Sequence, residues 1–307
     1  MIKPRIVLSR CFLKPTRYNG SKAFDEFVEK LLNYVDYIDV CPEVDIGLGI
    51  PRKNLIIIKE NDKKRLIQPE TGKDFTELIL SYSCETIKKF DSIDGFIFKA
   101  KSPSCGVSSA KIYENNKIIG KTSGIFAEIV KLKFPYLPVE DEGRLRNEDI
   151  RKHFMIRIFS FAEFRKIFET QKISNLVNFH TKYKFLLLTY NQKILRELGK
   201  IIADGKMDVS EKFKKYKELF YKAFIRKPSP KRHINTILHI YGHFSKYLNK
   251  EEKKHFINLI EKYKMGIVEL QVLVELLRSF ALRFGDEYVK IQRYLQPYPE
   301  KLEKFRY

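Results

Sequence analysis

The feature that most constrains the fold of this chain is a change of pattern near residue 147. Before it, short apolar runs alternate with amphipathic stretches, which predicts strands over 6–8, 35–40, 55–58, 95–98 and 137–139 and helices over 21–34, 74–90 and 122–134. Beyond it the pattern is helical throughout, over 148–170, 174–190, 192–203, 208–226, 231–247, 251–263, 267–283 and 286–293. We therefore predict an α/β N-terminal domain, a parallel sheet with flanking helices, followed by an all-α C-terminal domain. The predicted bounds are 1–146 for the first domain, 147–172 for a connecting helix and 173–307 for the helical domain.

The charge of the chain is divided unequally between these parts. The net charge is +21, of which residues 1–150 carry +3 and residues 151–307 carry +18. Such a contrast predicts that the helical half binds a polyanion. Nucleic acid is the first candidate, because neutralising its phosphates releases counterions and so favours binding. A lysine-rich composition from an AT-rich genome is the alternative, and it explains the contrast poorly.

Hydropathy predicts a cytoplasmic protein with no membrane partner. The sequence contains no apolar run of the roughly 18–20 residues that a membrane span needs. The uncharged run that follows the first five residues is too short for the core of a signal peptide. Neither a dedicated protein partner nor an oligomeric state is indicated.

All four cysteines lie in the first 105 residues. In an intracellular chain of this size they are more often metal ligands or catalytic groups than disulfides. Cys11, Cys41 and Cys105 each follow a predicted strand, and the loops after strands gather on the ligand-binding side of such a sheet. Cys84 falls in a predicted helix, and we expect it in the core. Without a Cys-x-x-Cys motif, the spacing alone is a weak signal for a metal site.

The surroundings of these cysteines form several motifs in a fixed order. They are SRCFL at 9–13, RYNG at 17–20, CPE at 41–43, GLGIPR at 47–52 and SPSCG at 102–106. In this combination, residues 3–145 resemble the TudS thiouracil desulfidase family.

The helical half carries a second resemblance. The segments FHTKYK at 179–184, RHIN at 232–235, HIYGHF at 239–244 and YLQPYP at 294–299 are similar to the YbgA-type helical domain that is often fused to TudS-like domains. Tyr183 and Tyr190 stand where we would expect histidines of that domain. The fused arrangement resembles desulfidases of the RudS type, which act on 4-thiouridine in tRNA.

The first resemblance implies a 4Fe–4S cluster held by Cys11, Cys41 and Cys105, with one iron left open. An open iron is a Lewis acid for the soft sulfur of a thiocarbonyl, which allows hydrolysis without net redox change. It also implies that Glu43 and Ser102 are the catalytic pair, with Ser104 in reserve. The alternatives are a capping or salt-bridged role for Glu43, and a turn-forming role for the two serines around Pro103.

Basic residues beside the motifs are the candidates for contacting the substrate. Arg17, Arg52 and Lys101 could hold the base or a phosphate, or be ordinary surface charges. In the helical half, the predicted tRNA-binding residues are Lys212, Lys215, Lys227, Lys231 and Arg232. The aromatic residues on the same stretch could stack on bases. Their helical spacing favours a core stripe instead, made of Phe213, Tyr216, Phe220 and Phe224.

These observations together predict an iron–sulfur desulfidase that converts 4-thiouridine in tRNA to uridine. The alternatives are the same chemistry on free thiouracil or thiolated nucleotides, an RNA-binding protein with a structural metal, and a sulfur-inserting iron–sulfur protein. A second domain with a charge of +18 argues for tRNA over a free base. The chain has no Gly-x-x-x-x-Gly-Lys-Ser/Thr loop for ATP, which disfavours sulfur insertion.

Overall fold

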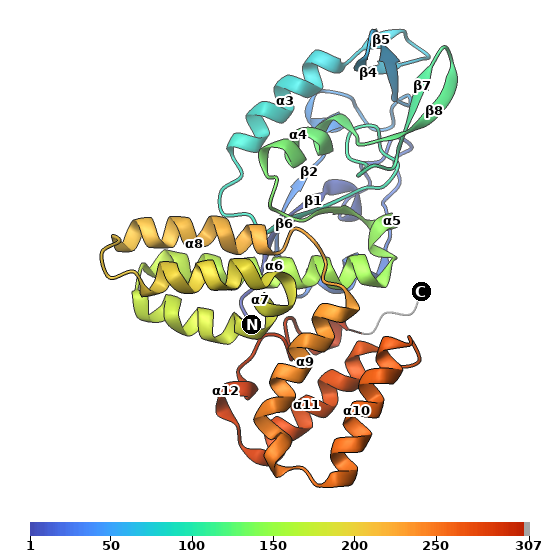
Figure 1. Cartoon of the computed structure of the whole chain (residues 1–307). Coiled ribbons are helices and arrows are strands. Elements are labelled where there is room, and N and C mark those ends of the chain that lie inside the picture. Colours follow the sequence, from blue (N-terminus) through green and yellow to red (C-terminus); the bar gives the residue numbers. More distant parts are fainter. Residues whose placement is uncertain (304–307) are drawn as a thin grey trace. The chain divides into compact units, whose positions relative to one another are not determined.

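The computed structural model describes residues 1–303 and divides into two compact units. The first comprises residues 1–163 together with the short stretch that begins at Glu300, and the second is Phe164–Pro299 (Figure 1). The division falls inside the helix α6 (Glu148–Thr170), within the stretch predicted as a connector.

The first unit contains the parallel sheet that the sequence predicts. Its strands are β1 (Arg5–Ser9), β2 (Asp36–Val40), β6 (Gly95–Phe98) and β9 (Val139–Asp141), in the order β2-β1-β6-β9, and every neighbouring pair is parallel. The remaining helices of the unit are α1 (Glu26–Leu32), α2 (Pro42–Asp45), α3 (Thr76–Lys88), α4 (Ile125–Lys133) and α5 (Glu142–Leu145). The predicted α/β fold class is confirmed.

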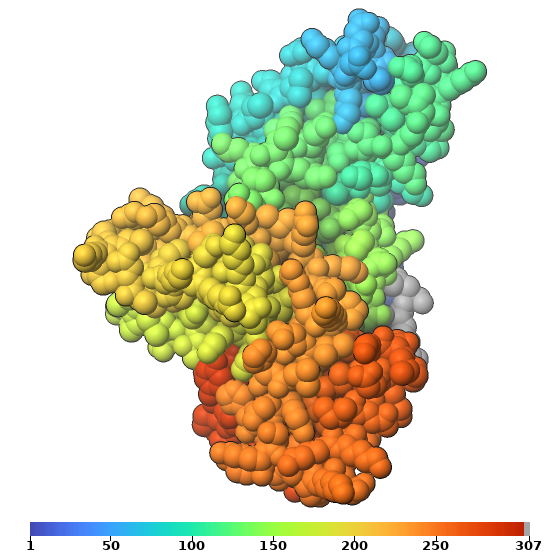
Figure 2. Space-filling view, viewed as in Figure 1, coloured from blue at the N-terminus to red at the C-terminus, as the bar shows by residue number. Residues whose placement is uncertain are grey.

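A second sheet of five strands was not predicted. It is made of β3 (Ile56–Glu60), β4 (Lys63–Gln68), β5 (Lys73–Asp74), β7 (Ala110–Glu114) and β8 (Lys117–Thr122), in the order β5-β4-β3-β7-β8. All pairs are antiparallel except β3 with β7. The β7–β8 hairpin projects from the surface of the first unit (Figures 1 and 2). The strand predicted over 55–58 therefore exists, but it belongs to this mixed sheet.

The core of the first unit is built from aromatic residues of β6 and the helix α4. Phe96 and Phe98 are wholly buried, and the ring of Phe98 meets that of Phe126 edge-on at 5.5 Å. The helix α3 buries Ile79, Ser83 and Ile87. Cys84 is exposed, so its predicted place in the core is wrong.

The second unit is helical, as predicted. It contains α7 (Ile173–Ala203), α8 (Val209–Ala223), α9 (Pro230–Phe244), α10 (Lys250–Lys264), α11 (Leu270–Phe284) and α12 (Glu287–Lys290). The helix α7 is broken at Asn191, whose φ of −158° and ψ of 95° are not helical, and the two predicted helices 174–190 and 192–203 meet there. The stripe of Phe213, Tyr216, Phe220 and Phe224 is wholly buried, which confirms the core interpretation. Among the described residues, no helix is both long enough and apolar enough to cross a membrane.

Candidate active site

Three of the four cysteines line one cavity at the carboxyl end of the parallel sheet. Cys11 lies in the short 3-10 helix η1 (Arg10–Phe12) after β1, Cys41 directly follows β2, and Cys105 lies in the loop after β6. Because β1 runs between β2 and β6, parallel to both, the three loops leave the same edge of the sheet. All three side chains are buried, and they contribute to a cavity of about 270 Å³. The expected convergence is therefore present.

Burial keeps these three thiols protonated. Loss of solvation raises the pKa of Cys11 to about 12, and the neighbouring Cys41 raises it further. Burial likewise raises the pKa of Cys41 and, well above its usual range, that of Cys105. Three such thiols ionise together only when a cation enters among them.

Glu43 is a buried carboxylate on the wall of the same cavity. It lies in α2, two residues beyond Cys41. Its Oε2 accepts a hydrogen bond from Nε of Arg52 at 2.8 Å and forms an ion pair with Nη2 at 2.6 Å. Nη1 of Arg52 donates to the carbonyl oxygen of Thr16 at 3.1 Å. Arg52 therefore holds Glu43 in place. We predicted Arg52 to contact the substrate, and in the structure its guanidinium binds Glu43 and Thr16. The salt-bridged alternative for Glu43 describes the same contact.

The two candidate serines hold different positions. Ser104 is wholly buried, and its Oγ donates to Oε1 of Glu43 at 2.9 Å. Ser102 lines the cavity, lies 3.4 Å from the same oxygen, and accepts hydrogen bonds from the backbone N–H groups of Ser104 and Cys105 at 3.2 and 3.1 Å. Ser102 thus shapes the cysteine loop and reaches the cavity, whereas Ser104 orients the carboxylate.

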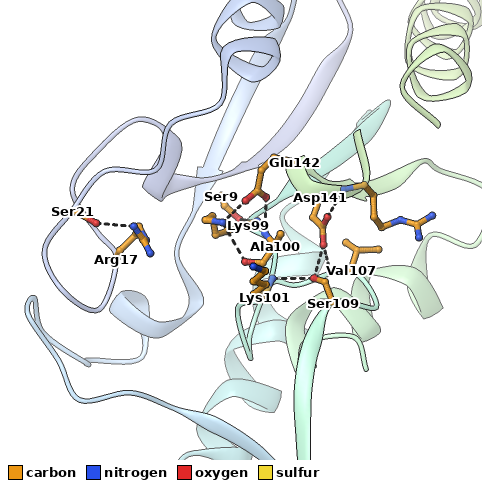
Figure 3. Close-up of polar contacts among 11 residues, drawn as sticks. Ser9, Arg17, Ser21, Lys99, Ala100, Lys101, Val107, Ser109, Asp141 and Glu142 are labelled. Carbon is orange, nitrogen blue, oxygen red and sulfur yellow. Dashed lines mark hydrogen bonds and ion pairs between the residues drawn. The ribbon is translucent and has the colours of Figure 1, made fainter. Parts of the chain in front are cut away.

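Arg17 and Lys101 also line the cavity, at some distance from these contacts. Nη1 of Arg17 donates to Oγ of Ser21 at 2.9 Å, and Figure 3 shows the guanidinium turned toward that hydroxyl. Lys101 has a left-handed backbone with a φ of 64°, and its N–H donates to Oγ of Ser109 at 3.0 Å. Within residues 1–303 neither cation pairs with a carboxylate, so both remain available to an anionic or acceptor ligand.

Two carboxylates that sequence reasoning missed support the loop after β6 (Figure 3). Glu142 pairs with Nζ of Lys99 and accepts from the backbone N–H of Ala100 at 2.6 Å. Asp141 is wholly buried and accepts from Oγ of Ser109 at 2.6 Å. The available signal was the acidic run 140–142, which directly follows the apolar run 137–139.

A third ion-pair group fixes the other two cysteine segments to each other. Arg10, next to Cys11, donates to Asp39 at 2.6 Å and to Asp45 at 2.6 Å. Burial would raise the pKa of Asp45, but hydrogen bonds from Arg10 and Tyr82 lower it below its usual range. A carboxylate and a guanidinium that both stay charged hold η1 against α2.

The predicted tRNA-binding residues of the second unit are only partly exposed. Lys212 is buried, and its Nζ donates to the carbonyl oxygens of Ile202 and Asp204 at 3.3 and 2.6 Å, so its prediction as a surface cation is wrong. The remaining four residues are exposed, namely Lys215, Lys227, Lys231 and Arg232. Lys215 pairs with Glu211 at 2.7 Å, and Arg232 donates to the carbonyl oxygen of Tyr190 at the break in α7.

Comparison with known proteins identifies the first unit. A family model described as 2-thiouracil desulfurase matches residues 6–142. The uncharacterized protein YbbK of Bacillus subtilis is 34% identical over 125 residues, covering 38% of this chain and 81% of the relative. The chain belongs to the 2-thiouracil desulfurase family. Its first unit is a desulfidase domain of the thiouracil type.

The helical part of this desulfurase family member matches a second family model, described as protein of unknown function DUF1722, over residues 184–299. The uncharacterized protein YbgA of Escherichia coli is 24% identical over 148 residues, covering 47% of this chain and 88% of the relative. A solved structure described as 4Fe-4S-dependent thiouracil desulfidase TudS is 24% identical to this chain, with a TM-score of 0.36. The match covers 47% of this chain and 94% of the solved chain. The predicted combination of a TudS-like domain with a YbgA-like domain is confirmed.

Proposed function

We propose that the chain is an iron–sulfur desulfidase that converts 4-thiouridine in tRNA to uridine. The observation that carries the proposal is the cavity of the first unit, where three buried cysteines meet a carboxylate fixed by Arg52 and Ser104. Membership of the thiouracil desulfurase family supplies the reaction class.

The donor set fits a 4Fe–4S cluster with three protein ligands. Within residues 1–303, no group of three or more His, Cys, Asp or Glu side chains is arranged to hold a single metal ion. The cysteines of a cluster bind different irons, so they stand further apart than the ligands of one ion. Cys11, Cys41 and Cys105 would be the ligands, and the exposed Cys84 would not take part. When bound, such a cluster supplies one iron without a thiolate, a Lewis acid for the soft sulfur of a thiocarbonyl.

The side chains of the cavity supply the proton chemistry. Oε1 of Glu43 is fixed beside the two serines and can take a proton from an attacking water. The Arg52 clamp on the other oxygen keeps that geometry without rearrangement. Ser102, at the cavity wall, directs its hydroxyl to the same carboxylate oxygen and helps to orient it.

Loss of the thiocarbonyl near-ultraviolet absorbance tests the reaction. After anaerobic loading with iron and sulfide, we expect the protein to consume 4-thiouridine in tRNA and to release one sulfide per uridine formed. Alanine at Cys11, Cys41 or Cys105 abolishes both the loading and the turnover, and Cys84→Ala, the matched control, changes neither. Intact absorbance with a fully loaded cluster would reject the desulfidase and favour RNA binding or sulfur insertion.

The proposal of tRNA as substrate rests on the positive charge of the second unit. Lys193, Arg196 and Lys200 occupy one face of α7 beyond its break, all exposed, and within the described chain none of them forms an ion pair. Arg232, bound to the carbonyl of Tyr190, holds the start of α9, with the exposed Lys231, at the break in α7. All five residues are exposed cations of the second unit and are suited to phosphates.

Charge reversal separates tRNA from a free thiobase. The triple variant K193E/R196E/K200E should weaken tRNA binding and reduce its salt dependence by about one unit of log–log slope for each phosphate that is no longer neutralised. It should leave the turnover of free 4-thiouracil unchanged. The control K250E/K253E/K254E, with the same charge change on exposed residues of α10, should retain tRNA binding. Equal effects of both variants, or faster turnover of the free base than of tRNA, would favour the thiobase alternative.

A further inference from the structure

Lys99 is a cation in the wall of the cavity that the proposed chemistry does not use. It follows β6, and its side chain is 24% exposed, while its partner Glu142 is 8% exposed. The backbone fixes both residues: the N–H of Lys99 donates to Oγ of Ser9 at 3.0 Å, and the N–H of Ala100 donates to Oε2 of Glu142 at 2.6 Å. Figure 3 shows the two side chains facing each other across this turn.

The hydrogen bonds of the ammonium leave one donor unused. A lysine ammonium has three N–H groups. In the described structure one is directed to Oε1 of Glu142 and one to the carbonyl oxygen of Ala100 at 3.3 Å. Since Lys99 lines the cavity, the third N–H is available to a molecule bound there. Because the side chain is partly open to the cavity, an acceptor on the ligand can take the place of water at this N–H.

The polar groups that line the cavity are complementary in kind to one edge of a thiouracil base. That edge presents the sulfur, then the N3–H donor, then the C2 carbonyl oxygen. In the proposed function the cysteines face the sulfur, and Lys99 is a hydrogen-bond donor in the same cavity wall. We infer that Lys99, held by Glu142, donates to the C2 carbonyl oxygen and so selects 2-oxo-4-thiopyrimidines over bases that lack this acceptor. This inference rests on the proposed function and deepens it.

The test compares ligands with and without the C2 oxygen. Uracil and pyrimidin-4-one, and likewise 4-thiouracil and pyrimidine-4-thione, differ by the C2 oxygen and by the N1 proton that goes with it, so the change in preference between wild type and variant isolates the part that depends on Lys99. We expect the wild type to bind uracil about 10- to 100-fold more tightly than pyrimidin-4-one, the range expected for a hydrogen bond from a charged donor. The variant K99M/E142Q, which leaves no unpaired buried charge, should lose this preference by weakening the binding of uracil alone. For the loaded enzyme, kcat/KM should show the same loss of preference between the two thiones.

A second ion pair provides the control. Lys64 and Glu128 are joined at 2.7 Å and lie outside the cavity, so K64M/E128Q should retain the preference. Thermal unfolding verifies that both double variants fold. An equal loss for both ligands of a pair, or an unchanged preference in K99M/E142Q, would overturn the role of Lys99. The comparison of uracil with pyrimidin-4-one measures binding only and does not require desulfurisation. A protein that prefers uracil through Lys99 but does not remove sulfur would therefore refute the proposed reaction and leave the role of Lys99 intact.

Discussion

Gly124 is the position where the smallest change should do the most harm to the cysteine site. It caps α4 at its N-terminus and lies against the backbone of the cysteine loop. A Cβ placed there would stand 2.5 Å from the carbonyl oxygen of Ser104 and 2.7 Å from the backbone nitrogen of Cys105, and would also overlap the Ser104 carbonyl carbon. The obstructing atoms are backbone, so no side chain can turn away. Ordinary contact at ~3.5 Å requires the loop to retreat by about 1 Å.

That retreat would lengthen the hydrogen bonds that join the loop to α4. The N–H of Gly124 donates to Gly106 at 2.8 Å, that of Ile125 to Pro103 at 3.1 Å, and that of Ala127 to Ser104 at 3.2 Å. With overpacking at about 1–3 kcal/mol and a weakening of the three hydrogen bonds by about 1 kcal/mol in all, Gly124→Ala should lower the free energy of unfolding of the first unit by about 2–4 kcal/mol.

Urea unfolding and iron content measure the two consequences separately. We expect Gly124→Ala to unfold at a lower urea concentration and to retain less iron after anaerobic loading, because Cys105 moves with the loop. Gly49→Ala is the matched control, since nothing lies within 4 Å of its added Cβ. If both variants had the same stability and the same iron content, the argument that this backbone contact positions Cys105 would be wrong.

Three further outcomes are expected. Glu43→Gln should bind iron as the wild type does but lower kcat by roughly 10²–10⁴, as for loss of a general base; normal turnover would remove Glu43 from the chemistry. Burial, and after it the charge of Lys184, lowers the pKa of His180 to about 4. Folding therefore opposes protonation of His180, and the free energy of unfolding should fall by up to about 3 kcal/mol as the pH is lowered from 6.5 to 4. His180→Phe should remove that slope in pH-dependent urea unfolding, and an unchanged slope would exclude this origin. Lys212→Met should cost about 1–3 kcal/mol of stability in thermal unfolding by leaving two carbonyls without a donor, whereas Lys215→Met should cost less than about 1 kcal/mol.

The sequence predicts elements with strong apolar periodicity and misses short polar strands. The parallel sheet and the helices of the second unit follow from that periodicity. The strands β4 and β8 carry several lysines, which obscure the alternation that marks a strand. A signal was nevertheless present in the turns, because Asn61-Asp62 and Asn115-Asn116 have positive φ and are residue types that favour two-residue hairpins.

Two side chains were placed on the wrong side of their helices for identifiable reasons. Cys84 forms an apparent stripe with Leu80 and Ile87, but α3 buries Ile79 and the small polar Ser83 instead. Lys212 has the sequence pattern of a surface cation, yet its Nζ donates to carbonyl oxygens at the C-terminal end of α7, where helix carbonyls lack intrahelical partners. The local sequence does not show which helix face is buried when that face includes a serine. It also does not show which distant carbonyl groups will accept hydrogen bonds from a lysine.

The candidate site was predictable in its sulfurs and not in its charges. The position of three cysteines after strands is a local property, whereas the pair Lys99–Glu142 joins residues that the sequence separates by 43 positions. Glu43 was implied by the family resemblance, but only the fold shows its clamp by Arg52. Pairing across a cavity is a tertiary property.

The charges of the cavity bear on how a metal centre could enter it. The carboxylate of Glu43 and the ammonium of Lys99 are each compensated by a fixed partner, while the three thiols carry no charge at neutral pH because burial raises their pKa values. New negative charge must therefore arise at the sulfurs as the metal binds, with release of their protons. Acid should oppose loading through these thiols, and the uncompensated cations Arg17 and Lys101 in the wall should favour it by balancing the thiolates.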